Sequence, residues 1–243
     1  MAPADEISDK YSRRRVLYGR RKGRRLRSGQ SRLVAEYLPK LEIAQLPDTG
    51  HLNPPTLFPP DTDEIWLEIG FGAGEHMLAQ AAANPRVGFI GCEPFFNGVV
   101  QMIGGIHDQG LNNIRVYRDD ARILLAQLPD AGISRAFVLF PDPWSKTRHH
   151  KRRIISIPVL DELARILKPG AELRIATDDP GYLNWILQCA ICHGGFDWLA
   201  RRPVDWREKP DDWPDSRYEV KARLAGRSCA YLRFVSLPGE IPR

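Results

Sequence analysis

Residues 65–74 read Ile-Trp-Leu-Glu-Ile-Gly-Phe-Gly-Ala-Gly, a mostly apolar run that ends in alternating glycines. The run predicts a short buried strand, because β-branched and aromatic side chains favour strands. The glycines predict a tight turn after it, since glycine adopts backbone conformations that other residues avoid and lets the chain approach a ligand closely. A strand-to-helix turn often needs glycine for geometry alone, so this stretch by itself does not establish a binding site.

The chain after residue 61 repeats this pattern of strand and helix. Apolar runs predict strands over residues 65–69, 87–92, 114–118, 135–140 and 172–176, and amphipathic runs predict helices over residues 76–83, 96–107, 121–128, 158–167 and 182–193. Repeated β-α units imply parallel strands with helices on both faces of the sheet. An alternating run over residues 229–236 predicts a late strand, which we take as antiparallel. The sequence therefore predicts an α/β fold with a doubly wound, mostly parallel sheet.

Basic residues are concentrated in one segment near the N-terminus. The 243-residue chain has a net charge of +5, yet residues 10–32 hold eleven basic side chains and no acidic one. A solvated tail is one interpretation of such a run, whereas the interleaved Tyr11, Leu17, Tyr18 and Leu26 favour a segment that becomes ordered on a polyanion. Prolines over residues 47–60 fit a linker or a segment that wraps over the surface. We therefore expect a basic arm and linker over residues 1–60 and one α/β domain over residues 61–243.

Other features of the composition narrow the class of protein. No apolar run approaches the roughly 18 residues that a membrane span needs, and the N-terminus lacks a secretory signal pattern, so we expect a cytoplasmic protein without membrane contact. The four cysteines lie in apolar stretches, which predicts reduced, buried thiols, and no spacing of ligand residues indicates a metal site. The sequence indicates no obligate protein partner and allows a monomer or a homodimer.

Acidic residues follow successive predicted strands, where ligands of parallel sheets bind. Glu68 is suited to the ammonium group of a methionine, and Glu93 to the two hydroxyls of a ribose. Asp120, followed by the small residue Ala121, is suited to an adenine amino group. Three carboxylates fit S-adenosylmethionine better than a cofactor with a pyrophosphate, which would require basic or neutral donors. The glycines also lack the dinucleotide spacing Gly-x-Gly-x-x-Gly. Those expected at the cofactor are Gly70, Gly72 and Gly74.

A second acidic motif follows the fourth predicted strand, where residues 140–146 read Phe-Pro-Asp-Pro-Trp-Ser-Lys. The two prolines restrict the backbone, so Asp142 would be held rigidly beside Trp144. A rigid carboxylate next to an aromatic ring suits a splayed-out nucleic-acid base, and a merely stiff loop is the alternative. Residues 146–153 are strongly basic, which favours contact with RNA phosphates over a solvated surface. Asp178 adds an acid after the fifth strand, whereas residues 216–219 fit a structural turn equally well.

Taken together, these motifs resemble the bacterial tRNA (guanine-N7)-methyltransferase family. The resemblance extends from about residue 65 to the C-terminus, and the Gly-Arg-Arg-Lys-Gly-Arg-Arg segment at residues 19–25 is also similar to members of that family. Its most specific part is Pro-Asp-Pro-Trp-x-Lys-x-Arg-His-x-Lys-Arg-Arg at residues 141–153. One departure is Ser216, where the family more often has threonine, and the hydroxyl group is retained.

The resemblance implies a Rossmann-like methyltransferase fold and roles for individual residues. Asp142 would belong to the catalytic centre and would also bind S-adenosylmethionine, together with Glu68, Glu93 and Asp120. The substrate would be the variable-loop guanosine of tRNA. The residues that would bind it are Lys146, Asp178, Ser216, Arg217, Tyr218 and Glu219. The residues that would contact the RNA are Arg148, His149, His150, Lys151, Arg152 and Arg153.

The implied reaction makes limited demands on the protein. Guanine N7 carries a lone pair and no proton, so it can attack a sulfonium methyl group without a general base, and the protein must align the reactants and stabilise the cation that forms. We hypothesise that carboxylates among Asp142, Asp178 and Glu219 accept hydrogen bonds from the guanine edge. A nucleotide-dependent oxidoreductase is disfavoured by the glycine spacing and by the lack of a recognisable hydride-transfer site. An RNA-binding protein with a vestigial pocket is disfavoured by the intact acids.

Overall fold

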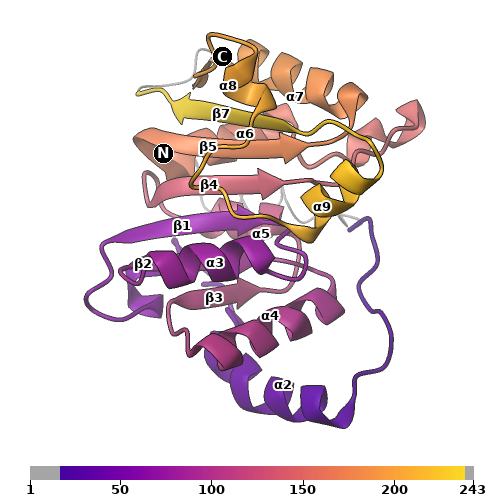
Figure 1. The fold of residues 1–243 in the computed structure, drawn as a ribbon. Helices are drawn as coiled ribbons and strands as arrows, with labels where there is room; N and C mark the ends of the chain where they lie inside the picture. The colour runs from indigo at the N-terminus through magenta and orange to yellow at the C-terminus, as the bar shows by residue number, and fades with distance from the viewer. Residues whose placement is uncertain (1–16, 239–243) are drawn as a thin grey trace.

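Parallel strands form the centre of the molecule, and the computed structural model describes residues 17–238. The strands are β1 (Glu64–Ile69), β2 (Val87–Cys92), β3 (Ile114–Tyr117), β4 (Ile133–Leu139), β5 (Leu167–Thr177), β6 (Phe196–Trp198) and β7 (Ala230–Ser236). They form one sheet in the order β3-β2-β1-β4-β5-β7-β6. Within β1 to β5, every pair of neighbouring strands is parallel, whereas β7 is antiparallel to both β5 and β6. In Figure 1 the arrowheads of β4 and β5 accordingly point one way and that of β7 the other.

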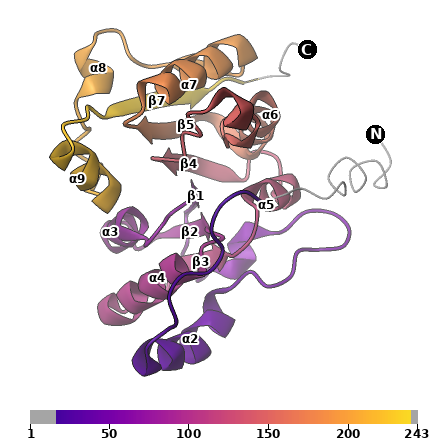
Figure 2. The same cartoon turned by 90° about the vertical axis from the view of Figure 1, so that its right-hand side faces the viewer.

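Helices cover both faces of this sheet. The α-helices are α2 (Ser28–Leu41), α3 (Glu75–Ala83), α4 (Phe96–Gln109), α5 (Ala121–Gln127), α6 (Ile157–Ile166), α7 (Pro180–His193), α8 (Val204–Arg207) and α9 (Arg217–Leu224). Two 3-10 helices, η1 (Pro54–Leu57) and η2 (Thr147–Arg152), lie in the connections. Figures 1 and 2 show α3 and α4 on the face opposite α5 and α6. The predicted doubly wound α/β fold is therefore confirmed.

The hydrophobic core has one part on each face of the sheet. Ile65, Leu67 and Ile69 belong to a buried cluster with side chains of α5, α6 and α7, whereas Trp66 belongs to a cluster with side chains of α3 and α4. This division follows from the strand itself, because successive side chains point to opposite faces. Glu68 is two residues from Trp66 and therefore faces the side of α3, where His76 is its hydrogen-bond partner.

Strand and helix boundaries agree with the sequence prediction to within a few residues, with some exceptions. The strand predicted from residue 172 begins at residue 167, because Leu167 already pairs with Ile133 before a register shift. The short elements β6, α8 and α9 were not predicted. The loop over residues 206–214 is rich in prolines and acids, yet its Trp213 is buried against the rings of His76 and Tyr231, at centroid distances of 6.5 and 5.5 Å. Burial of a large aromatic surface stabilises this otherwise polar loop.

The N-terminal segment packs on the domain. The Tyr37 hydroxyl on α2 lies 2.8 Å from Nδ1 of His107 on α4, and the Gly23 N–H donates to Oδ1 of Asn97 at 2.6 Å. Before α2, the chain crosses the carboxyl ends of the strands, as the indigo trace in Figure 2 shows. The part of the predicted basic arm before residue 17, with Tyr11, lies outside the described residues. From residue 17 onward, the arm is therefore folded against the α/β domain.

Candidate active site

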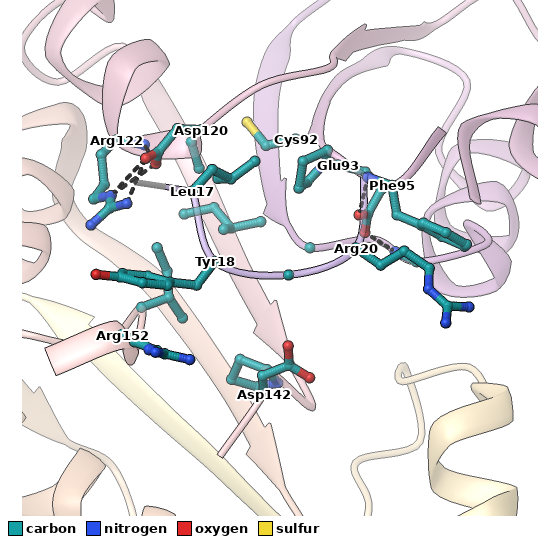
Figure 3. A pocket seen from close by; sticks show the side chains of 18 of the residues that line it. Leu17, Tyr18, Arg20, Cys92, Glu93, Phe95, Asp120, Arg122, Asp142 and Arg152 are labelled. Carbon is teal, nitrogen blue, oxygen red and sulfur yellow. Dashed lines mark hydrogen bonds and ion pairs between the residues drawn. The ribbon is translucent and has the colours of Figure 1, made fainter. Parts of the chain in front are cut away.

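A cavity of about 500 Å³ opens at the carboxyl ends of β1, β2, β3 and β4. This volume is within the range of small-molecule and cofactor sites. The arm also contributes to its wall (Figure 3), and Tyr218 adds a contact from the start of α9. The predicted site residues that line it are Gly70, Gly72, Glu93, Asp120, Ala121, Asp142, Arg152 and Tyr218. The strand ends therefore converge as the sequence analysis expected for these positions.

The glycine turn after β1 is shaped by close packing. Gly72 has φ +59°, and a Cβ there would lie 3.0 Å from the ring of Tyr218. A Cβ on Gly98 of α4 would lie 2.1 Å from the Gly72 carbonyl oxygen. Gly72 needs the conformational freedom of glycine, whereas Gly98 is a helical residue that needs the space a Cβ would take. The turn therefore lies directly between α4 and Tyr218. Gly74 does not line the cavity; its left-handed backbone precedes α3.

Glu93 is a buried carboxylate at the end of β2. The backbone N–H groups of Gly72 and Phe95 donate to its two oxygens at 2.8 Å each. Burial raises the pKa of Glu93 above its ordinary value of 4.5; the two backbone donors oppose this effect, and the charges of Asp142 and Glu68 add to it. Each carboxylate oxygen retains a lone pair, so Glu93 can still accept hydrogen bonds from a ligand.

Asp120, the residue predicted to bind an adenine amino group, already has a partner. Its side chain accepts a hydrogen bond from the Arg122 backbone N–H at 3.0 Å and caps α5. The Arg122 guanidinium also binds both oxygens, with Nε 2.8 Å from Oδ1 and Nη2 2.5 Å from Oδ2 (Figure 3). Arg122 was not among the residues predicted at the site. A base amino group can reach Asp120 only by sharing this carboxylate with the guanidinium or displacing it.

Glu68 does not line the cavity. It is 3% exposed, and its Oε2 lies 2.7 Å from Nδ1 of His76, which is equally buried. It remains close enough to Glu93 to influence the pKa of that carboxylate. The role predicted for Glu68 at a methionine ammonium group stays a prediction, and His76 is a partner that the sequence analysis did not identify.

The Pro-Asp-Pro-Trp loop after β4 is strained at both ends. Phe140 and Trp144 have φ values of 49° and 45°, a region that bulky side chains rarely adopt. Between them, Asp142 lines the cavity and is exposed to solvent. Phe140, which precedes Pro141, is left-handed and not extended as a residue before proline is expected to be. The rigid placement of Asp142 therefore stays a prediction.

Aromatic and cationic side chains close one side of the cavity. The guanidinium carbon of Arg152 lies 4.4 Å from the ring centre of Tyr18 and 4.9 Å from that of Trp144. The two rings meet edge to face at 6.3 Å. Tyr18 belongs to the arm, so a segment predicted from its charge to contact RNA also forms part of the wall. The lining residues that sequence reasoning missed in this arm are Leu17, Tyr18, Gly19 and Arg20.

The residues predicted to bind substrate occupy several environments. Lys146 is exposed, whereas Asp178 accepts a hydrogen bond from Nε of Arg227 at 2.7 Å. Ser216 caps α9 by accepting the Glu219 N–H at 3.2 Å. Arg217 donates to Glu75 at 2.6 Å.

Glu219 is almost fully buried and accepts the Tyr231 hydroxyl at 2.8 Å. Residues 216–219 therefore form the first turn of a helix fixed to the sheet. The hypothesised contact of Glu219 with guanine would require this buried side chain to change partners.

The basic run after the Pro-Asp-Pro-Trp loop forms η2, with one exception. Arg153 is buried, its Nε donates to the Pro143 carbonyl oxygen at 2.8 Å, and it lies over the rings of Tyr182 and Trp185. Its buried guanidinium positions the loop and cannot present its charge to RNA, contrary to the prediction for this residue. The side chains predicted to contact RNA that remain exposed or half-buried are Arg148, His149, His150, Lys151 and Arg152.

The part of the chain that the structure describes contains neither a cluster of metal ligands nor paired thiols. In residues 17–238 no group of three His, Cys, Asp or Glu side chains could hold a metal ion, and no helix there has the length and apolarity to cross a membrane. Cys92 is buried as predicted, but Cys189 and Cys229 are half-buried and Cys192 is exposed. The prediction of burial is wrong for Cys192 because only one side of α7 faces the core.

Comparison with known proteins agrees with this architecture. A family model described as a putative methyltransferase matches residues 62–231. Solved structures with the same fold include the 16S rRNA (adenine(1408)-N(1))-methyltransferase from Catenulisporales acidiphilia, at a TM-score of 0.52, 17% identity and coverage of 74% of this chain and 91% of that one. The 16S rRNA methyltransferase KamB has a TM-score of 0.51 at 16% identity, with coverage of 74% and 90%. The family model, which covers most of the chain, identifies it as a methyltransferase of the S-adenosylmethionine-dependent class, and the fold agrees with this.

Relatives in sequence are more specific. A protein of Rhodospirillum rubrum named tRNA (guanine-N(7)-)-methyltransferase is 50% identical over 224 residues, which are 91% of this chain and 88% of that protein. One of the same name from Roseobacter denitrificans is 47% identical over 91% of this chain and 96% of its own length. The chain belongs to the tRNA (guanine-N7)-methyltransferase family.

Proposed function

We propose that this protein transfers the methyl group of S-adenosylmethionine to N7 of guanine in tRNA, and that the target is the variable-loop guanosine at tRNA position 46. The observation that carries this proposal is the convergence of Glu93, Asp120 and Asp142 on one cavity beside a basic surface. Family membership supports the choice of tRNA. We further propose that the protein acts in the cytoplasm, as a monomer or homodimer without an obligate protein partner.

The cavity fits the cofactor. Its volume of about 500 Å³ suits a nucleoside, the tight glycine turn admits close approach of a ligand, and the acidic residues offer acceptors to hydroxyl and amino groups. Bound S-adenosylmethionine would supply an electrophilic methyl group on a positively charged sulfur. Glu93 would hold the ribose hydroxyls, and Asp120 the adenine amino group. When the base binds, the Arg122 guanidinium would either move away from Asp120 or share the Asp120 carboxylate with the adenine amino group.

The chain's own contribution to the reaction is alignment and charge stabilisation. Asp142, held by the strained loop, would accept a hydrogen bond from the guanine edge while positive charge develops on the purine. A hydrogen bond that strengthens in this way stabilises the transition state more than the ground state. Trp144, beside Asp142, would provide a surface against which the guanine stacks. No general base is required, because N7 carries no proton.

The test is mass spectrometry of nucleosides from unmodified tRNA after incubation with the protein and S-adenosylmethionine, followed by mapping of the modified position. We expect 7-methylguanosine at position 46. The Asp142→Ala variant should lose at least about 100-fold in turnover, the order of a lost preorganised transition-state contact. Asp130→Asn, an exposed acid paired with Arg165 at 2.6 Å, is the matched control and should leave turnover unchanged. Turnover of Asp142→Ala within a few fold of the wild type would remove Asp142 from the mechanism.

A further inference from the structure

A second cavity, of about 590 Å³, lies on the same rim of the sheet as the candidate active site. Its walls come from the end of β5, the start of α7, the residues around α8, the end of α9 and the start of β7. It shares no lining residue with the first cavity. Because β5 is the neighbour of β4 in the sheet, the second cavity is next to the loop that carries Asp142. The Ser145 hydroxyl of that loop donates to Oδ2 of Asp179, which lines the second cavity, at 3.3 Å.

Three guanidinium groups converge on this second cavity. Arg227 pairs with Asp178 at 2.7 Å, and Arg223 lies 3.4 Å from Asp215. Arg207 has no ion pair with any residue in the range 17–238; its guanidinium carbon lies 4.8 Å from the ring centre of Trp206. An arginine stacked on an aromatic ring keeps its N–H groups at the edge of the plane, where they can bind phosphate.

The chemistry of this lining is that of a site for part of a nucleic acid. Guanidinium groups bind phosphate through paired hydrogen bonds, and carboxylates such as Asp178 and Asp179 accept from ribose hydroxyls or base amino groups. The volume is large enough for one nucleotide. A guanosine drawn into the first cavity leaves its neighbour in the strand within reach of the adjacent cavity, because consecutive nucleotides are covalently linked.

We infer that the second cavity binds the nucleotide adjacent to the target guanosine, with the linking phosphate on Arg207 and the sugar and base between Trp206 and the Asp178–Arg227 pair. This inference rests on the proposed function and adds a subsite to it. The subsite would hold the RNA strand in register with the methyl donor, so it would affect the KM for tRNA more than kcat.

The experiment tests whether Arg207 and one RNA phosphate contribute to the same interaction. Two tRNAs are assembled by ligation, with a neutral methylphosphonate on the 5′ or on the 3′ side of the mapped target guanosine. Each is assayed for methyl transfer with the wild type and with Arg207→Gln, which leaves the Asp178–Arg227 pair in place. One of the two tRNAs should show a KM about tenfold higher with the wild type, as for a lost hydrogen bond between charged groups. With Arg207→Gln the natural tRNA should show the same increase, and the methylphosphonate should add nothing to it.

Controls separate this inference from the proposed function. Arg86→Gln, which removes an exposed arginine paired with Asp63 at the opposite end of the strands, should respond to the methylphosphonate like the wild type. The inference would be overturned if the increases in KM from Arg207→Gln and from either methylphosphonate were additive. It would also be overturned if inorganic phosphate or GMP bound in the cavity while Arg207→Gln and the methylphosphonates acted independently. If the wild type methylates no natural tRNA, the proposed function itself fails before this comparison begins.

Discussion

At the scale of single residues, the ionisation of Glu93 governs the candidate cofactor site. Its pKa is raised by burial, so the carboxylate takes up a proton at a pH above 4.5. A protonated Glu93 cannot accept hydrogen bonds equally through both oxygens. We therefore expect the affinity for S-adenosylmethionine to be complete above this raised pKa and to fall as the pH decreases through it. Calorimetric titration of the protein with S-adenosylmethionine at pH values above and below the pKa of Glu93 measures the effect. Glu93→Gln should bind more weakly and show little of this pH dependence; an unchanged acid limb in that variant would assign the titration to another group.

A second prediction at this scale concerns Gly72. Gly72→Ala places a Cβ at φ +59° and 3.0 Å from the Tyr218 ring, so both the backbone and the cavity wall are disturbed. Gly170→Ala is a matched control, with φ +81° and no atom within 4 Å of the added Cβ. Each substitution should lower the free energy of unfolding by about 1–2 kcal/mol, the cost of a left-handed residue. Only Gly72→Ala should weaken binding of S-adenosylmethionine, and equal affinities of the two variants would contradict the assigned packing.

Residue chemistry at the site could be predicted only in part. Glu93, Asp120 and Asp142 could be identified because parallel strands bring their carboxyl ends to one rim, a rule that needs no side-chain detail. The partners Arg122 and His76 could not. Which lone pairs a carboxylate retains depends on rotamers and packing that a linear pattern does not encode. The burial of Arg153 escaped prediction for the same reason, since its charge run is uniform along the sequence.

Among the elements, α9 lines both cavities, with Tyr218 in the first and Arg223 in the second. Its N-cap is Ser216, whose Oγ accepts the Glu219 N–H. Ser216→Ala should cost about 1 kcal/mol, as for other lost N-caps. Because α9 has only eight residues, we expect its first turn to fray and the KM for tRNA to rise several fold at nearly constant kcat. Steady-state kinetics at saturating S-adenosylmethionine provide the measurement. Ser216→Thr retains the hydroxyl and should behave as the wild type; a rise in KM for this variant too would show that the cap is not the cause.

The elements also differ in how well the sequence predicts them. β2 was predicted with its exact bounds because an uninterrupted apolar run lies between clear turn signals. By contrast, β6 has three residues, of which only Phe196 is buried, so it has no periodicity to detect. Half of the residues of helix α9 are charged, and it buries only Glu219 and Ala222. Such elements form because the surrounding structure supplies their partners, and tertiary contacts outweigh their local preferences.

At the scale of the whole molecule, the basic arm joins RNA contact to the cofactor cavity. Deletion of residues 1–27 should reduce the slope of log K for tRNA against log salt, by about 0.7 for each single-strand phosphate released. It should also weaken binding of S-adenosylmethionine, because residues 17–20 line the cavity. The combined variant Arg24→Gln, Arg25→Gln removes exposed charges outside that lining and should change the salt dependence alone. Unaltered cofactor affinity after the deletion would mean that the arm does not close the cavity in solution.

Strand β7 lies between β5 and β6 in the sheet, although it follows both in the chain. During translation, β5 and β6 therefore emerge from the ribosome before the strand that pairs with them. Until β7 is released, one edge of β5 keeps its N–H and C=O groups open to other chains, and such edges promote aggregation. A nonsense mutation shortly before residue 230 would consequently remove far more than seven residues of structure: it would leave a nascent product with an unprotected edge, a substrate for chaperones and proteases.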